Sequence, residues 1–160
     1  MRPRYQDIPA ARIPNAKTDD GRVSVKVIAG EALGAKAVID VRTPIVYLHF
    51  TLQPGGEIVQ PVPAGFNALV YVVGGEVRVG DDQRIVSEGE MAILTEGDSI
   101  RLGKNAADKS AADVLLLAGL PLREPVARYG PFVMNTQEEI SQAMTDYRAG
   151  KMGTIPADIG

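Results

Sequence analysis

The 160-residue sequence contains no cysteine and no tryptophan, and its one histidine is His49. Without cysteine the chain cannot form disulfides, thiolate nucleophiles or sites in which cysteine binds zinc or an iron–sulfur cluster. With one histidine it cannot build a three-histidine metal centre by itself. Aromatic residues make up only 5% of the chain, so a surface that stacks the bases of single-stranded nucleic acid is hard to build.

Clustered positive charge and long apolar segments are also missing from the sequence. Lys and Arg occur singly along a chain of net charge -3, whereas direct binding to a phosphate backbone needs a basic patch. The longest apolar run, residues 114–122, is too short to span a bilayer, and residues 1–14 lack the apolar core of a signal peptide. We therefore expect no direct nucleic-acid binding, no membrane insertion and a cytoplasmic location.

Most of the chain has the alternating pattern of short β-strands. Val23, Val25 and Val27 recur with a period of two, and residues 45–52 (IVYLHFTL) place four large apolar side chains on one face. Gly74-Gly75 lies between two such runs and indicates a hairpin. About ten short strands with regularly spaced turns are typical of a β-sandwich or a small barrel.

One segment near the C-terminus is helical in pattern. Thr136 and Glu139 have the spacing of a capping box, apolar residues follow at positions 140, 143, 144 and 147, and Gly150 suits the helix end. We expect an extended N-terminal arm at residues 1–14, a β-barrel at residues 15–134, and an amphipathic helix with a tail at residues 135–160.

Two segments resemble the paired motifs of the cupin superfamily, residues 71–77 (YVVGGEV) and 89–98 (GEMAILTEGD). In that superfamily the first motif supplies two His and one Glu as metal ligands, and the second supplies another His. The resemblance places these four positions at Pro61, Pro63, Ala68 and Ile100. None of these residues binds a metal, so we expect no metal, no cofactor and no catalytic residue.

Longer strings narrow the resemblance to one family. Residues 3–9 (PRYQDIP), 27–34 (VIAGEALG), 61–77 (PVPAGFNALVYVVGGEV) and 128–143 (RYGPFVMNTQEEISQA) are similar to the carboxy-terminal half of pirins. Pirins are bicupins, in which the amino-terminal cupin holds the metal and the carboxy-terminal cupin is typically metal-free. The resemblance implies an all-β cupin fold, a jelly-roll barrel or double-stranded β-helix, with one C-terminal α-helix and without the metal-bearing half.

Two kinds of site remain open. The barrel interior offers a pocket whose expected lining is Pro61, Pro63, Asn67, Tyr71, Thr95 and Ile100; alternatively, large apolar residues such as Phe66, Ile100 and Met91 fill that interior. His49 is the one candidate general base, because imidazole titrates near neutrality. The alternative for His49 is an ordinary strand residue beside Tyr47 and Thr51.

The resemblance implies three functional hypotheses. The chain is a structural or binding module for proteins or small ligands, non-catalytic alone, which forms a homodimer or pairs with a missing amino-terminal half. Alternatively it is part of an oxidoreductase resembling quercetin 2,3-dioxygenase, whose metal-bearing domain is missing here. As a third alternative it is a transcriptional co-regulator that acts through a protein partner.

Overall fold

The computed structural model describes residues 5–153, which fall into two units that are described separately. The first unit ends at Pro121 and the second begins at Leu122. The expected boundary before the helix lies at residue 135, whereas in the structure the hairpin before that residue belongs with the helix. Residues 1–4 of the expected arm and 154–160 of the expected tail lie outside the described residues.

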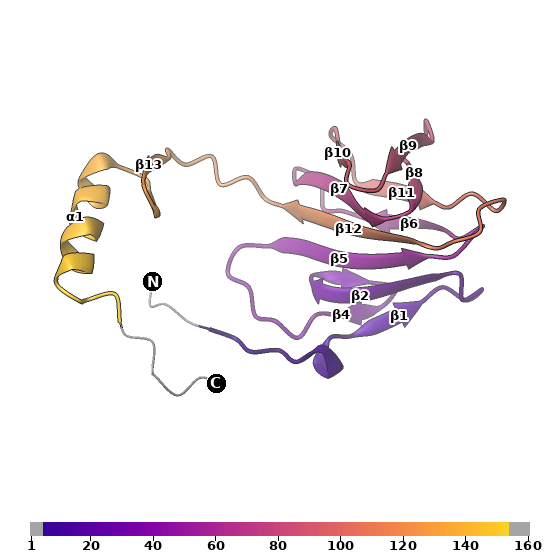
Figure 1. Ribbon diagram of the computed structural model, residues 1–160, viewed down its shortest axis with the longest axis horizontal. Coiled ribbons are helices and arrows are strands. Elements are labelled where there is room, and N and C mark those ends of the chain that lie inside the picture. Colours follow the sequence, from indigo (N-terminus) through magenta and orange to yellow (C-terminus); the bar gives the residue numbers. More distant parts are fainter. Residues whose placement is uncertain (1–4, 154–160) are drawn as a thin grey trace. The chain divides into compact units, whose positions relative to one another are not determined.

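The first unit consists of two main antiparallel sheets, and Figure 1 shows the strands of the larger sheet side by side. In order across the sheet, the six strands are β1 (Asn15–Lys17), β2 (Val23–Ala29), β5 (Ile45–Leu52), β12 (Ala112–Gly119), β7 (Asn67–Gly74) and β10 (Met91–Ile93). The four strands of the second sheet are β6 (Glu57–Pro61), β11 (Ser99–Gly103), β8 (Glu76–Val79) and β9 (Arg84–Ser87). A small hairpin, β3 (Glu31–Ala32) and β4 (Ala35–Lys36), completes this unit.

The core lies between the two main sheets. β5 alternates as the sequence predicts, with Val46, Leu48, Phe50 and Leu52 all less than 10% exposed. These side chains form one cluster with apolar residues of the smaller sheet, among them Leu102. Two facing antiparallel sheets around one core confirm the all-β jelly-roll prediction.

The N-terminal arm is only partly extended. A short 3-10 turn, η1, covers Ala10–Arg12. The side-chain amide of Gln6 donates to the Asp40 carbonyl at 2.8 Å and accepts from the Asp40 amide at 3.0 Å. These two hydrogen bonds attach the arm to the segment before β5.

The second unit is a hairpin with a helix packed against it. β13 (Ala127–Tyr129) pairs with β14 (Phe132–Met134), and both contact α1 (Gln137–Arg148). The predicted capping box is confirmed: the Thr136 hydroxyl accepts from the Glu139 amide at 3.2 Å, and the Glu139 carboxylate accepts from the Thr136 amide at 3.0 Å. Gly150 follows the helix with a φ of +69°, as its predicted role at the helix end requires. No helix in the described part of the chain is long and apolar enough to cross a membrane.

Gly75 gives a test of the β7–β8 hairpin. It has a φ of +77°, and a Cβ there would lie 2.7 Å from the Ala111 carbonyl oxygen. Gly89 has a similar φ of +80°, but nothing would lie within 4 Å of its Cβ. We expect Gly89→Ala to lower the free energy of unfolding by about 1–2 kcal/mol, the cost of a left-handed backbone. Gly75→Ala should lower the free energy of unfolding by a further ~1–3 kcal/mol, because the added methyl group overpacks the site. Urea unfolding of both variants measures the difference. Equal losses in the two variants would show that the close approach at Gly75 is relieved without cost.

Candidate functional site

The side chains of β6 and of the two residues that follow it lie at one end of the jelly roll and determine what that end can bind. Along β6 and the two residues that follow it, Gln60 is 4% and Val62 is 7% exposed, whereas Pro61 and Pro63 are exposed. The side chains that point into the jelly roll are therefore Gln60 and Val62, one residue before the pair expected from the resemblance. Because side chains alternate in a strand, a shift of one residue exchanges its inner and outer faces.

Neither pair fits a metal ion. Proline, valine and the nearby Ala68 and Ile100 offer no side-chain donor, and Gln60 offers only a neutral amide. Among residues 5–153 no group of three or more His, Asp or Glu side chains converges as metal ligands would. Since the donor set does not match any common site, no chemical step for this chain is derived through a metal.

The side-chain amide of Gln60 is held by two backbone carbonyl groups. Its Nε2 donates to the Pro61 carbonyl at 2.9 Å and to the Glu31 carbonyl at 3.2 Å. Two acceptors on the same side fix which end of the amide is the NH₂ group. The opposite atom, Oε1, takes no hydrogen bond from the described residues.

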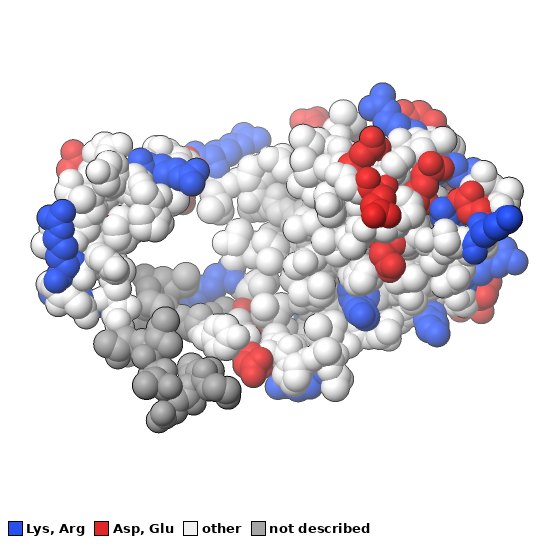
Figure 2. Space-filling model, in the orientation of Figure 1, with Lys and Arg blue, Asp and Glu red and all other residues white. Residues whose placement is uncertain are grey.

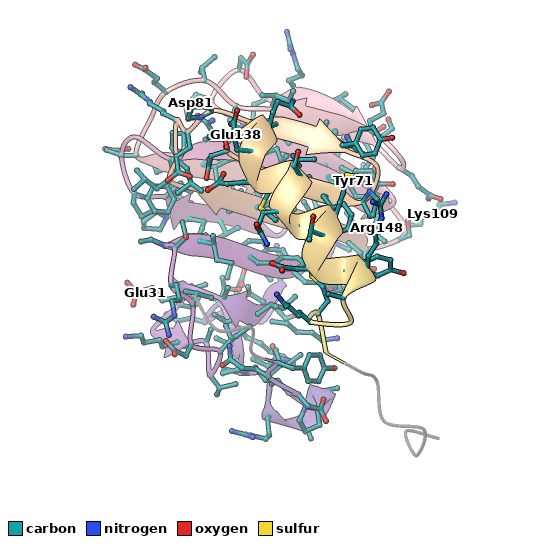
Figure 3. All side chains as sticks on the ribbon, turned by 90° about the vertical axis from the view of Figure 1, so that its left-hand side faces the viewer. Glu31, Tyr71, Asp81, Lys109, Glu138 and Arg148 are labelled. Carbon is teal, nitrogen blue, oxygen red and sulfur yellow. The ribbon has the colours of Figure 1, made fainter. Side chains whose placement is uncertain are left out.

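Two cavities open near this strand. The first, called the apolar cavity, has a volume of about 750 Å³ and is lined by Gln60, Pro61, Val62 and Pro63 together with the β3–β4 hairpin and the segment before β5. The second, called the charged cavity, has a volume of about 590 Å³ and is lined by the β8–β9 and β10–β11 turns. In Figure 3, Glu31 and Asp81, one from each lining, lie at separate levels of the first unit.

Four of the six expected pocket residues line one or the other of these two cavities. Pro61 and Pro63 line the apolar cavity, and Thr95 and Ile100 line the charged cavity. The side chains of Val62 and Phe66 line both cavities. Gln60 was not among the expected site residues, although an uncharged polar residue in the apolar run of residues 58–63 is a visible signal.

Other expected interior residues lie elsewhere. Asn67, at the start of β7, is exposed, and Tyr71 pairs with Met91 on the face of the larger sheet away from the core. Tyr71 is 38% and Met91 53% exposed. Met91 therefore does not fill the interior. Side chains alternate along β10, and the neighbouring Ala92 is the one that packs against the core.

His49 has a carboxylate neighbour that the sequence did not reveal. Its Nε2 lies 3.3 Å from Asp113 Oδ1, and the Thr51 hydroxyl donates to the same oxygen at 2.7 Å. The imidazole and carboxylate are close enough for an ion pair, but they are not aligned as a hydrogen bond. The register between β5 and β12 brings these residues together from positions 62–64 residues apart in sequence. The group lies on the outer face of the larger sheet, away from both cavities.

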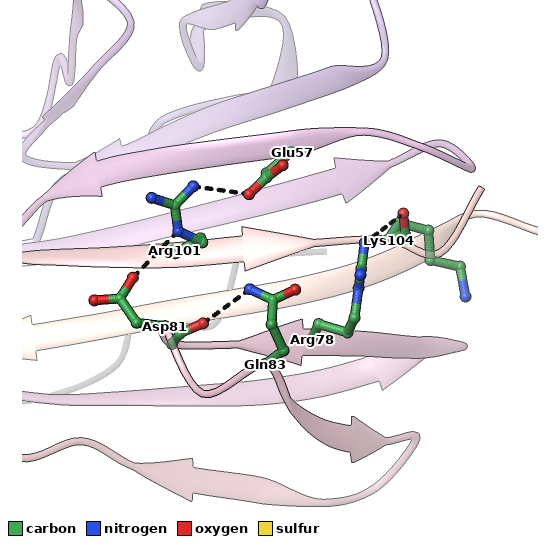
Figure 4. A network of polar contacts seen from close by, with 7 residues as sticks. Glu57, Arg78, Asp81, Gln83, Arg101 and Lys104 are labelled. Atoms are coloured by element: carbon green, nitrogen blue, oxygen red, sulfur yellow. Dashed lines mark hydrogen bonds and ion pairs between the residues drawn. The ribbon is translucent and has the colours of Figure 1, made fainter.

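The outer face of the smaller sheet carries a charged network, drawn in Figure 4. Arg101 donates to Glu57 at 2.8 Å and to Asp81 at 3.2 Å. The hydrogen bond to Glu57, followed by the one to Asp81, raises the pKa of the Arg101 guanidinium. The buried Lys104 pairs with Asp108 at 2.5 Å. Figure 2 shows acidic side chains gathered over this end of the first unit. These contacts pair Arg101 and Lys104 with carboxylates of the same chain.

Comparison with known proteins agrees with this geometry. The family model described as the pirin C-terminal cupin domain matches residues 47–153. Pirin from Homo sapiens is 44% identical over 155 residues, which are 96% of this chain and 52% of that protein. A pirin-like protein from Solanum lycopersicum is 43% identical over 96% of this chain and 52% of its own length.

A solved structure is similar as well. The crystal structure of quercetin 2,3-dioxygenase from Acinetobacter baumannii superposes with a TM-score of 0.83 at 36% identity, over 96% of this chain and 52% of that one. The chain thus spans about half the length of the relatives that it matches. It belongs to the pirin family, and it corresponds to the carboxy-terminal cupin domain of that family.

Proposed function

We propose that this domain is a non-catalytic binding module that docks against another protein domain through the outer face of its six-stranded sheet. The observation that carries the proposal is a pair of apolar rows on that face. Across the strands, one row contains Ile93, Leu69, Leu117 and Tyr47. The adjacent row contains Met91, Tyr71, Leu115 and His49.

These rows form one continuous surface of seven apolar residues and His49, called the apolar face below. Ile93 is 77% and Met91 53% exposed at its β10 edge, and the three leucines at its centre are partly buried. An antiparallel sheet that faces water normally carries polar side chains on its outer side. The outer face of the smaller sheet is mixed: Glu57, Arg78 and Arg101 lie beside the exposed Val59 and Ile85. A contiguous apolar patch marks an interaction surface.

The occupant that fits this face best is the companion half of a longer pirin. The relatives are about twice as long as this chain, so they carry a second segment of similar size. Interfaces between domains of one chain bury about 600–1,500 Å² and keep them together. In the absence of that half, the same surface favours pairing with a second copy of this chain.

The residues present favour binding over catalysis. The positions at which cupins hold a metal carry no suitable donor, and His49 with Asp113 lies on the apolar face, outside both cavities. We assign His49 to the docking surface. A regulatory role through a protein partner uses the same face, and a cytoplasmic location stays a prediction.

Self-association tests the docking surface. We expect the chain to form a concentration-dependent dimer in analytical ultracentrifugation, and Ile93→Glu to weaken it about tenfold or more, because a charge is buried in the contact. The matched control is Ile85→Glu, since Ile85 is also an exposed isoleucine, 59% exposed, on the edge strand of the smaller sheet. A strict monomer at high concentration, or equal effects of the two substitutions, would count against this face.

Quercetin dioxygenation is the second candidate function, and the similarity to the Acinetobacter baumannii enzyme favours it. That similarity covers about half of the enzyme, and the donor set in this chain does not support the chemistry. We expect iron, nickel, copper, zinc and manganese in the purified chain to stay far below one per chain by elemental mass spectrometry. Quercetin turnover should stay at background after iron is added. Stoichiometric metal with turnover would move catalysis to first place, and its loss in His49→Ala would locate the metal at His49.

A further inference from the structure

We infer that the apolar cavity binds a small, uncharged, largely apolar molecule that carries a hydroxyl group, and that Gln60 Oε1 accepts the hydrogen bond from this hydroxyl. The apolar cavity is a different surface from the apolar face, so ligand binding there does not depend on docking.

The walls give the cavity its apolar character. They come from the β3–β4 hairpin, the segment that leads into β5, and the residues around the end of β6, with Ala32, Leu33, Ile39, Val41, Val46 and Phe66 among them. The volume of about 750 Å³ lies within the range typical of small-molecule sites. A site of this kind takes apolar ligands and uses a few polar groups to orient them.

Gln60 supplies the polar group. It is 4% exposed, and its NH₂ group is occupied by the carbonyl oxygens of Glu31 and Pro61. Oε1 is therefore turned the other way, and no described residue donates to it. Oε1 is not a fully buried atom and is open to the cavity. A ligand that fills the cavity takes this oxygen out of water, and only a ligand with a hydrogen-bond donor replaces the hydrogen bond that is lost.

The charges at the rim point to a neutral ligand. Glu31 and Lys36, which line the cavity, face each other across the β3–β4 hairpin and are both exposed. One negative and one positive group in water leave no net charge to attract an ion. The charged cavity differs, because Asp81, Asp82, Arg84, Glu96 and Arg101 contribute to its lining.

The turn of the hairpin adds an independent observation. Leu33 and Gly34 form its two central residues, with φ values of +48° and +76°. Asn-Gly is the favoured pair in such a turn, and a bulky residue with positive φ stores strain. Strain of this kind gathers at ligand sites, and the strained leucine lines the cavity.

The experiment uses 2-naphthol as the probe and 2-methoxynaphthalene, which has no hydroxyl donor, as its matched control. Each is titrated into ¹⁵N-labelled chain and followed by amide NMR. Gly30 and Gly34 line the apolar cavity, whereas Gly80 and Gly97 line the charged cavity. We expect 2-naphthol to shift the Gly30 and Gly34 amides and to leave Gly80 and Gly97 in place. Its affinity should exceed that of the methyl ether by about tenfold, the effect of one hydrogen bond to a buried acceptor.

Two variants distinguish the contribution of the hydrogen bond to binding from the contribution of the cavity walls. Gln60→Met keeps the volume and removes the acceptor, so the preference for 2-naphthol over its ether should disappear. Leu33→Asn suits the turn, preserves folding, and should weaken both probes alike. The inference is overturned if neither probe shifts Gly30 and Gly34, if wild type binds both probes equally, or if the shifts fall on residues of the apolar face. Repeating the titration with Ile93→Glu keeps this result distinguishable from a failure of docking.

Discussion

The pairing of β5 with β12 is the constraint on which the rest of the structure depends. All eight residues of each strand take part, from Ile45 opposite Gly119 to Leu52 opposite Ala112. This register directs Leu48, Phe50 and Leu116 into the core and His49 and Leu115 outward. A slip of one residue would exchange the two faces of the central strand. The core and the apolar face are therefore two results of one register.

The strands and the helix were accessible from the sequence because local patterns encode them. The alternation of residues 45–52 and the capping box at Thr136 and Glu139 depend on near neighbours only. The His49–Asp113 contact was not accessible, since it depends on the pairing of two strands far apart in sequence. Gln60 left a signal as a polar residue in an apolar run, but only the structure shows that its side chain faces inward. The resemblance gave the right family and placed the expected ligand pair one residue away from the inward-facing pair. The boundary between the units was also hidden, because β13 and β14 look like any other hairpin in the sequence.

The end of the jelly roll contains no group of metal donors among the described residues, but it does contain an inward-facing polar side chain. A strand residue that points inward must be apolar or have its polar atoms satisfied. Val62 meets the first condition and the NH₂ group of Gln60 meets the second, whereas the amide oxygen of Gln60 takes no hydrogen bond from the described residues and is open to the apolar cavity. The strained turn at Leu33 closes the same cavity. The unpaired amide oxygen of Gln60 and the strained turn at Leu33 line the same cavity. A bound ligand explains this coincidence more easily than the folding of the chain alone.

The apolar face differs from the cavity because its exposed residues lie at the edge of a sheet. Its leucines lie at the centre of the sheet, where neighbouring strands already cover part of each side chain, whereas Ile93 and Met91 at the β10 edge stay open. An open apolar edge strand invites pairing or packing with another chain. An interaction at β10 also leaves the apolar cavity accessible, because none of the residues lining that cavity belongs to β10. Docking and ligand binding can therefore occur together, and a ligand in the cavity has no direct contact through which to compete with a partner on the sheet.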